Sequence, residues 1–238
     1  MFVTTVPAPI FGTNCYVMAP AVGEECVVVD PGIGVLSALD STLREARLRP
    51  VAVLLTHGHV DHVYSVTPVC GARGVAAYIH GDDRYRLADP IGTLDPLVVE
   101  MLRAQFGRIR WAEPDDVRPL TDGMMLSVAG LSIRVDHAPG HTEGSVLFHL
   151  PAPAADDAPT CLSGDVLFAG SIGRTDLAGG DHATMLHTLG TKILPLPDDT
   201  AVLPGHGPAT TIGRERASNP FLQGLPVGPG PVSAPPGR

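Results

Sequence analysis

The chain has 238 residues, of which 44% are hydrophobic and 17% are charged, so it can bury a full core and is not a disordered protein. Its formal net charge of −9 argues against nucleic-acid binding, which requires a basic face. No apolar run approaches the length that crosses a bilayer, so we expect no membrane partner.

The N-terminal stretch, MFVTTVPAPIFGTNCYVM, contains no basic segment followed by an apolar one, and therefore predicts no signal peptide. The four cysteines are scattered along the chain without a CxxC pair. This spacing suits neither a disulfide scaffold nor a cysteine zinc site. We therefore expect a soluble cytoplasmic protein with reduced thiols.

The first half of the chain predicts an α/β unit. Residues 25–32 (ECVVVDPG) predict a buried strand that stops at a Pro-Gly turn. Residues 35–46 carry apolar side chains at helical spacing, and Pro50 is expected to end this helix. Residues 51–55 and 74–80 predict further strands. In such a unit, the polar residues that follow a strand lie at the edge of the sheet where ligands bind.

The second half changes to short apolar runs separated by turn residues. Residues 117–141 predict a meander of antiparallel strands, and the loop PAPAADDAP separates the strands that follow. The later elements are predicted as strands at 145–150, 160–168 and 200–204, and helices within 181–194 and 211–218.

The C-terminal residues 221–238 are rich in glycine and proline. They hold too little apolar surface to fold, so we expect a disordered tail. The folded part is then a single domain at residues 1–220.

A dense group of polar residues, THGHVDH at residues 56–62, directly follows the predicted strand at 51–55. In extended backbone His57 and His59 point the same way, and a turn after His59 would aim Asp61 and His62 at a second point nearby. Packing these groups at a strand end costs desolvation free energy unless they share a metal or a network. Nitrogen and carboxylate ligands suit zinc, and also iron or manganese.

Three later residues have the same setting, a tight turn at the end of an apolar run: His141 in HAPGHTEGS, Asp165 in LSGDVLF and His206 in AVLPGHGP. With the first motif they make five histidines and two aspartates from four loops, which is enough for two metals with a shared carboxylate. The remaining histidines at 80, 149, 182 and 187, taken singly, are expected to be surface or core residues.

The order HxHxDH, PGHT, GD and PGHG resembles the metallo-β-lactamase superfamily, from GTNCYVM to RERASNPF. Within it, HAPGHTEGS and GDVLFAGSIGRTDLAGGD resemble the glyoxalase II-type thioester hydrolases, also called hydroxyacylglutathione hydrolase-like proteins. The resemblance implies an α+β fold, a four-layer αββα sandwich with the metals at one edge between the sheets.

The resemblance also implies the roles of the site residues. One metal would be held by His57, His59 and His141, the other by Asp61, His62 and His206, with Asp165 between them. Zinc is expected, and iron or manganese would also fit these ligands. The implied reaction is hydrolysis of a thioester such as S-lactoylglutathione by a hydroxide that bridges the metals, which Asp61 would orient as the catalytic residue.

Other residues near these motifs have less certain roles. Arg174 in GRTD could contact an anionic substrate, or pair with Asp176 or a ligand carboxylate in support of the site; we favour support. His137 is also expected to support the ligands rather than bind metal. The segment from Gly81 to Arg110 could be a lid or a surface helix, and we favour the helix.

The chain departs from the long glyoxalase II enzymes because only a short helix and the tail follow His206, and because GRTD replaces the residues that contact glutathione there. The thiol carrier and the oligomeric state therefore stay open. A persulfide dioxygenase with one iron at His57, His141 and Asp165 is the main alternative. Such dioxygenases resemble one another in an Asp-Tyr pair after the last histidine, whereas Gly-Pro follows His206 here, which favours the hydrolase. A lactonase, a β-lactamase and a non-catalytic metal-binding scaffold are less favoured.

Overall fold

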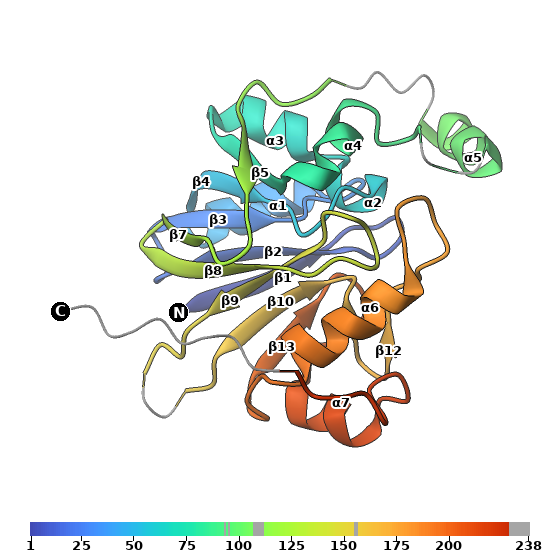
Figure 1. Cartoon of the computed structure of the whole chain (residues 1–238). Helices are drawn as coiled ribbons and strands as arrows, with labels where there is room; N and C mark the ends of the chain where they lie inside the picture. The colour runs from blue at the N-terminus through green and yellow to red at the C-terminus, as the bar shows by residue number, and fades with distance from the viewer. Residues whose placement is uncertain (93, 95, 107–111, 155–156, 229–238) are drawn as a thin grey trace.

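The computed structural model describes residues 1–92, 94, 96–106, 112–154 and 157–228. Two six-stranded sheets lie face to face, and helices cover the outer side of each sheet (Figure 1). The predicted α+β architecture, a four-layer αββα sandwich, is thereby confirmed. Among the described residues, no helix has both the length and the apolar character needed to cross a membrane.

The first sheet has the strand order β1-β2-β3-β4-β5-β6. Strands β1 to β3 pair antiparallel, and β3 to β6 pair parallel. Its strands are β1 (Phe2–Pro7), β2 (Asn14–Ala19), β3 (Glu25–Val29), β4 (Arg49–Leu54), β5 (Ala76–His80) and β6 (Val117–Leu120). The helices on its outer side are α1 (Leu36–Glu45), α2 (Val60–Val63), α3 (Val66–Arg73) and α4 (Arg84–Ala88).

The second sheet has the order β14-β13-β10-β9-β8-β7, with β10 and β13 parallel and the other pairs antiparallel. Its strands are β7 (Met125–Val128), β8 (Leu131–His137), β9 (Val146–Leu150), β10 (Thr160–Gly164), β13 (Ala201–Pro204) and β14 (Thr210–Thr211). A small hairpin, β11 (Leu167–Phe168) and β12 (Ser171–Ile172), follows β10. The outer helices are α6 (His182–Thr188), its π-helical continuation (Leu189–Ile193) and α7 (Ile212–Ser218).

Strand β3 shows how the sequence forms the central layers. Val27 and Val29 pack between the two sheets, whereas Cys26 and Val28 pack under the helices of the first sheet. A strand covered on both faces has no polar side, and this is why ECVVV reads as a continuous apolar run. Phe148 of β9 and Ile133 of β8 meet the inner side from the second sheet.

Two predictions about local structure are wrong. Pro50 does not end the helix at 35–46, because it lies inside β4 opposite Cys26. The helix ends instead at Glu45, where Arg47 takes a left-handed conformation (φ 54°) and the Leu48 N–H bonds to the Leu43 carbonyl, a Schellman arrangement. Strand β6 is also not part of an antiparallel meander.

Strand β6 pairs parallel with β5 in the first sheet, whereas β7, β8 and β9 form the antiparallel series in the second sheet. The alternation of side chains predicts a strand but does not tell which neighbour it pairs with. The strands β1 and β2 and the helices α2 and α3 are further elements that the sequence analysis did not identify.

The segment from Gly81 to Arg110 divides into two parts. A 3₁₀ turn (Gly81–Asp83) and α4 pack into the body, where Asp83 and Arg86 are buried. Helix α5 (Pro96–Phe106) is a surface helix at the periphery, with Leu97 76% exposed (Figure 1). Residues 107–110 lie outside the described part of the chain.

The predicted tail, residues 221–238, lies partly outside the described residues, which end at 228. Within it, Leu222 is buried against the helices of the second sheet, and the Gly228 N–H donates a hydrogen bond of 2.9 Å to the Gly190 carbonyl. The packed core therefore extends past residue 221.

Candidate metal centre

The HxHxDH motif lies at the carboxyl end of β4. His57 and His59 are in the extended segment that follows the strand, and His59 (φ −66°, ψ 145°) is the last residue before α2. Asp61 and His62 lie in the first turn of α2. The change from extended chain to helix therefore aims the two pairs of side chains at different points, because side chains two apart share a direction only in extended backbone.

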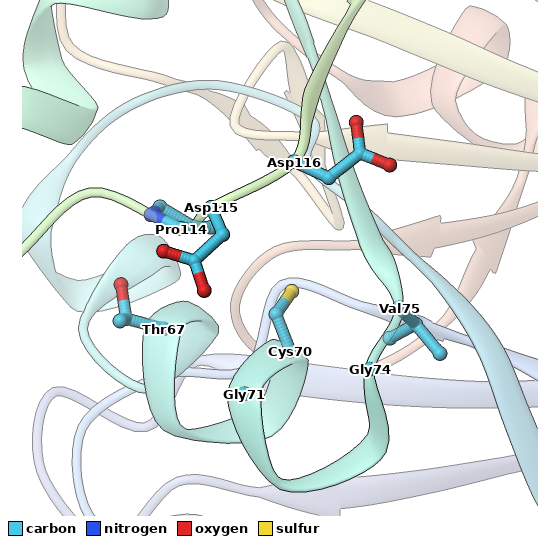
Figure 2. Close-up of a pocket in the computed structure, with 8 residues that line it drawn as sticks. All are labelled: Thr67, Cys70, Gly71, Gly74, Val75, Pro114, Asp115 and Asp116. Carbon is cyan, nitrogen blue, oxygen red and sulfur yellow. The ribbon is translucent and has the colours of Figure 1, made fainter.

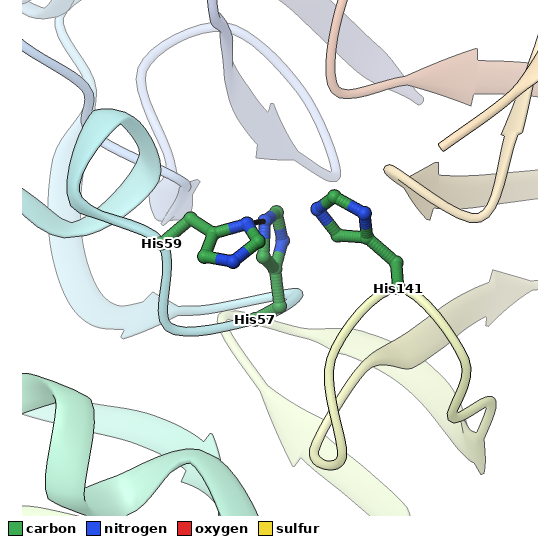
Figure 3. A group of neighbouring side chains, drawn as sticks. All are labelled: His57, His59 and His141. Carbon is green, nitrogen blue, oxygen red and sulfur yellow. Dashed lines mark hydrogen bonds between the residues drawn. The ribbon is translucent and has the colours of Figure 1, made fainter. Parts of the chain in front are cut away.

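The first group of donors joins the two halves of the chain. The rings of His57 and His59 come from the loop after β4, and that of His141 comes from the loop after β8 (Figure 3). The His57 Nε2 to His59 Nδ1 distance is 3.1 Å, and the His141 ring centroid lies 4.5 Å from that of His59 and 4.8 Å from that of His57. All three side chains are buried.

The second group consists of Asp61, His62 and His206. His206 follows β13, and its Nε2 lies 3.1 Å from Asp61 Oδ2 and 3.2 Å from His62 Nε2. Asp61 Oδ2 is 3.6 Å from His62 Nε2. In each group, one ligand atom per residue lies within 4.8 Å of the other two.

Asp165, directly after β10, lies between the two groups. Its Oδ2 is 3.6 Å from His141 Nε2 in the first group and 3.6 Å from His206 Nε2 in the second. Its Oδ1 is 3.4 Å from His62 Nε2. The structure thus brings all seven predicted ligands together at one edge of the sandwich, with a carboxylate between the two sets.

Asp30 fixes two of the histidine rings, and the sequence analysis did not identify it. Its Oδ2 lies 3.0 Å from His62 Nδ1 and accepts a hydrogen bond of 2.6 Å from the Thr56 hydroxyl. Thr56 Oγ1 in turn lies 3.1 Å from His57 Nδ1. These contacts leave Nε2 of both rings facing the cluster, which is the usual way that metal-binding histidines are oriented.

Asp30 directly follows strand β3, so the sequence places it at the same edge of the sheet as THGHVDH. It is buried and has a left-handed backbone conformation (φ 49°), which aspartate tolerates better than most residues. A carboxylate after a buried strand is the signal that could have found it.

Backbone carbonyls orient the rings of His141 and His206, the two other histidines whose Nε2 faces the cluster. His141 Nδ1 lies 2.7 Å from the Arg174 carbonyl, and His206 Nδ1 lies 3.1 Å from the Phe11 carbonyl. A carbonyl accepts only, so Nδ1 carries the proton in each ring and the Nε2 lone pair faces the cluster.

The GRTD segment contributes its backbone at this point. A Cβ on Gly173 would lie 1.8 Å from the Asp165 carbonyl oxygen and 2.9 Å from His141 Nδ1, so only glycine fits. The Arg174 side chain is exposed and makes a two-pronged pair with Asp176, at 2.7 Å for both contacts. Arg174 therefore meets the ligands through its carbonyl, and its guanidinium meets Asp176.

Asp83 is a second buried carboxylate that the sequence analysis did not identify. It accepts hydrogen bonds from Gly58 N (2.7 Å), the Thr142 hydroxyl (2.7 Å) and Gly144 N (3.0 Å). Gly58 lies between His57 and His59, and Thr142 follows His141. Asp83 therefore ties together the two loops that supply the first group of donors.

Arg86 balances the charge of Asp83 inside the protein. Its side chain is 1% exposed, and its Nε lies 3.3 Å from Asp83 Oδ1. A terminal nitrogen donates to Glu143 Oε2 and to the Ala178 carbonyl, each at 2.8 Å. The buried pair is therefore satisfied by further hydrogen bonds, as buried charges need to be.

His137 lies on the outer side of the His141 loop. Its Nε2 is 2.7 Å from the Glu143 carbonyl, and its ring stacks on that of His80 at a centroid distance of 3.9 Å. It therefore contacts the loop that carries His141 and groups with His80 and Asp82 rather than with the seven.

The electrostatics of the cluster favour cation binding. Burial and the neighbouring histidines lower the pKa of His57 well below its usual value, and burial with His141 lowers that of His59 to about 3. Burial opposes the charged form of His62, but Asp165 and Asp61 overcome it and raise its pKa. Burial likewise opposes ionisation of Asp165, and His62 keeps its pKa low.

The donor set fits a pair of divalent metals. Within the described part of the chain, His141 Nε2 and Asp165 Oδ1 are buried without a hydrogen-bond partner. Such orphaned polar atoms are costly unless a ligand satisfies them. Imidazole nitrogens and carboxylates are the donors that zinc, iron and manganese share.

A hollow of about 270 Å³ lies apart from this cluster, between α3 and the chain that precedes β6 (Figure 2). Cys70 and Thr67 line one side and Asp115 and Asp116 the other. It contains none of the seven donors, so its size alone does not make it the reaction site.

Comparison with known proteins places these residues in a family context. A family model described as the metallo-beta-lactamase superfamily matches residues 8–206. An uncharacterized protein of Mycobacterium tuberculosis is 45% identical over 226 residues, covering 94% of this chain and 99% of its own. The hydroxyacylglutathione hydrolase GloC of Haemophilus influenzae is 33% identical, covering 93% and 98%.

Two solved structures are also similar to the chain. BLEG-1, a B3 metallo-beta-lactamase, has a TM-score of 0.79 and 40% identity, covering 94% of this chain and 100% of its own. TTHA1623 in a di-iron-bound form has a TM-score of 0.75 and 36% identity, covering 92% and 100%.

Proposed function

The chain belongs to the metallo-β-lactamase superfamily, and from its donor geometry we propose that it is a binuclear metal-dependent hydrolase that cleaves thioesters. The observation that carries the proposal is the position of Asp165, whose carboxylate lies 3.6 Å from a histidine of each donor group. A shared carboxylate between two complete sets is the arrangement of a two-metal hydrolytic site.

Two bound divalent metals would lower the pKa of a shared water toward about 7 and polarise the carbonyl of the substrate. The first group, His57, His59 and His141, and the second, Asp61, His62 and His206, would hold them. Asp61 is the least buried carboxylate of the cluster, and it accepts a hydrogen bond of 3.2 Å from the Thr13 hydroxyl. It is therefore placed to orient a water on the solvent side as well as to bind metal.

The thiols of the chain support an attack by water rather than by a protein nucleophile. All four cysteines are buried, and burial raises the pKa of Cys26 and Cys70 to about 12. A thiol with such a pKa is not a nucleophile at neutral pH. A thioester also suits this site because its thiolate leaves without strong general acid help, thiols being more acidic than alcohols.

Similarity to the hydroxyacylglutathione hydrolase GloC supports an acyl thioester as the substrate class. The first test is release of thiol from S-lactoylglutathione by protein loaded with zinc or with iron. We expect release that is lost in His57→Ala. Release that persists in His57→Ala, or no release from any acyl thioester by fully loaded protein, would reject the proposal.

A β-lactamase is a second candidate, because the 40% identity to BLEG-1 extends over the whole of that chain. Turnover of a chromogenic cephalosporin in the same preparations separates the two activities. The one-iron alternative, a persulfide dioxygenase, would use His57, His141 and Asp165 and would leave the complete group around His206 without a role. Oxygen uptake with a persulfide tests it directly.

The metals themselves remain a proposal. Zinc suits the donors, and the di-iron form of TTHA1623 supports iron equally. Metal analysis of protein purified without added metal decides between them, because ligand type does not.

A further inference from the structure

Three further metal-type donors lie outside the cluster of seven donors described above, which is called the principal cluster from here on. They lie where one strand of each sheet ends. His80 is the last residue of β5, His137 is the last residue of β8, and Asp82 lies in the 3₁₀ turn after β5. One ligand atom of each lies within 4.8 Å of the other two. Like the principal cluster, this group sits where strand ends from the two sheets meet.

One of the donor–donor distances in this group equals that of ligands around a single cation, and the other is slightly longer. Asp82 Oδ2 is 3.6 Å from His80 Nδ1 and 3.9 Å from His137 Nε2, which is too long for a hydrogen bond. Donors bound at about 2.0–2.2 Å to one tetrahedral metal are separated by about 3.3–3.6 Å. Asp165 stands 3.4–3.6 Å from its histidines in the principal cluster, which is nearly the same spacing.

The two imidazoles lie face to face, with 10° between the ring planes and 3.9 Å between the centroids. Because each lone pair lies in its ring plane, one ring tilts when both bind the same cation. A contact of 3.4 Å from the Asp82 N–H to His80 Nδ1 indicates that the lone pair of this nitrogen faces the turn that carries the carboxylate.

The backbone around the group is fixed. The His137 N–H donates a hydrogen bond of 2.8 Å to Asp122 Oδ1, and Asp122 is paired with Lys192 at 2.8 Å. Asp82 precedes the buried Asp83, which is held by the loops of the principal cluster. Asp82 itself is exposed, so water can complete the coordination.

We propose that His80, Asp82 and His137 form a further metal site for a divalent transition cation such as zinc. Two imidazoles and one carboxylate match the ligand preference of zinc. The site is weaker than the principal cluster because it has three donors and is open to water. The inference concerns binding only and does not depend on thioester hydrolysis.

The site is linked to the loop of His141. His137 Nε2 donates to the Glu143 carbonyl at 2.7 Å, so a cation bound through Nε2 replaces this hydrogen bond and the ring proton shifts to Nδ1. Glu143 lies two residues after His141 and pairs with Arg86. Binding there is therefore coupled to the packing of this loop.

The test counts zinc equivalents by equilibrium dialysis of the full chain at buffered free zinc, followed by metal analysis. We expect the double variant H80Q/H137Q to bind one equivalent fewer than the wild type. The matched control is H182Q/H187Q, which alters two exposed histidines and should keep the wild-type number. An equal number in H80Q/H137Q and wild type would overturn the proposal.

Asp82→Asn gives an independent check that does not disturb a buried group. We expect this variant to bind the zinc equivalent that H80Q/H137Q loses with an affinity lower by about 10-fold or more, because an amide replaces a charged ligand. If zinc binding by Asp82→Asn were identical to that of the wild type, the assignment of Asp82 as a ligand would be wrong. Thiol release is measured in parallel, so that failure of the proposed function can be told apart from failure of this site.

Discussion

The first half of the chain supplies four of the seven donors from one short segment, His57 to His62, whereas the second half supplies one donor from each of three separate loops. Two of these histidines are oriented by residues of the same half, His62 by Asp30 and His57 by Thr56. The loops of the second half depend on the first: Asp83 holds the His141 loop, and the Tyr16 hydroxyl donates a hydrogen bond of 2.8 Å to the Pro204 carbonyl before His206.

The cluster is therefore assembled when the two halves dock, and neither half completes it alone. The local segment brings its donors close together whatever the rest of the chain does. The three distant donors reach them only when the sheets are packed. Perturbing the contacts between the halves should therefore affect metal binding as much as removing a ligand of the local set.

The largest effect is expected from Asp165→Asn, because this carboxylate touches both donor groups. We expect activity to fall by more than about 100-fold, since even residues that only support metal ligands cost about 10–100-fold. Measurement of kcat/KM with metal content determined on the same sample checks this. Wild-type activity at full metal content would show that the carboxylate is not shared.

Gly173→Ala tests the backbone contact between the GRTD segment and the second-half ligands. The added methyl would overlap the Asp165 carbonyl and approach His141 Nδ1, so the backbone must move. We expect a loss of about 1–3 kcal/mol in the free energy of unfolding, with weaker metal binding. Urea denaturation measures the free energy of unfolding, and competition with a chelator measures metal affinity. If neither changed, the backbone at residue 173 would have to accommodate the methyl group without cost.

Asp83→Asn breaks the tie between the loops of the two halves without changing a ligand. We expect metal affinity to fall by about 10–100-fold, because the first group loses its alignment. Competition with a chromophoric chelator measures this, and circular dichroism confirms the fold. The control is Asp176→Asn, an exposed carboxylate paired with Arg174, for which we expect wild-type affinity.

The buried His149–Asp136 pair lies in the second sheet, away from the cluster, and should make the stability of the protein depend on pH. Burial opposes the charged form of His149, but Cys161 and Asp136 outweigh it and raise its pKa from its usual value of 6.5 to about 9. The contribution of protonated His149 to the free energy of unfolding is therefore fully present below pH 6.5 and is lost as the pH rises through 9.

We expect the wild type to lose about 3 kcal/mol of unfolding free energy between pH 6 and pH 9.5 through this pair. His149→Gln should show a correspondingly smaller loss over the same range. Urea titrations at the two pH values test this, and parallel pH profiles for the two proteins would contradict it.

The smallest effect is expected from Arg174→Ala, the neighbour of Gly173. The side chain is exposed and pairs with Asp176, so its contribution to stability is within about 1 kcal/mol. Its carbonyl still accepts from His141 in the variant. We expect kcat and metal content close to wild type. A large rise in KM would instead show that the guanidinium binds an anionic substrate.

The kind of fold and the set of candidate donor residues can be inferred from the amino-acid pattern alone. Histidines two apart after a buried strand, and single ligands after later apolar runs, indicate a metal site because such groups are costly to bury without a partner. The apolar strands that are buried on both faces likewise follow from the pattern of β3.

How the donors are held and how the strands are paired follows from the packing of the two sheets. Strand β6 could not be assigned to β5 from its pattern, since alternation fixes faces and not neighbours. The tasks of Asp30 and Asp83 depend on partners that are distant in the sequence: Thr56 lies 26 residues from Asp30, and Gly58 and Thr142 lie 25 and 59 residues from Asp83. Long-range hydrogen bonds exist only once the sheets are packed, and they are what turns seven separate side chains into one site.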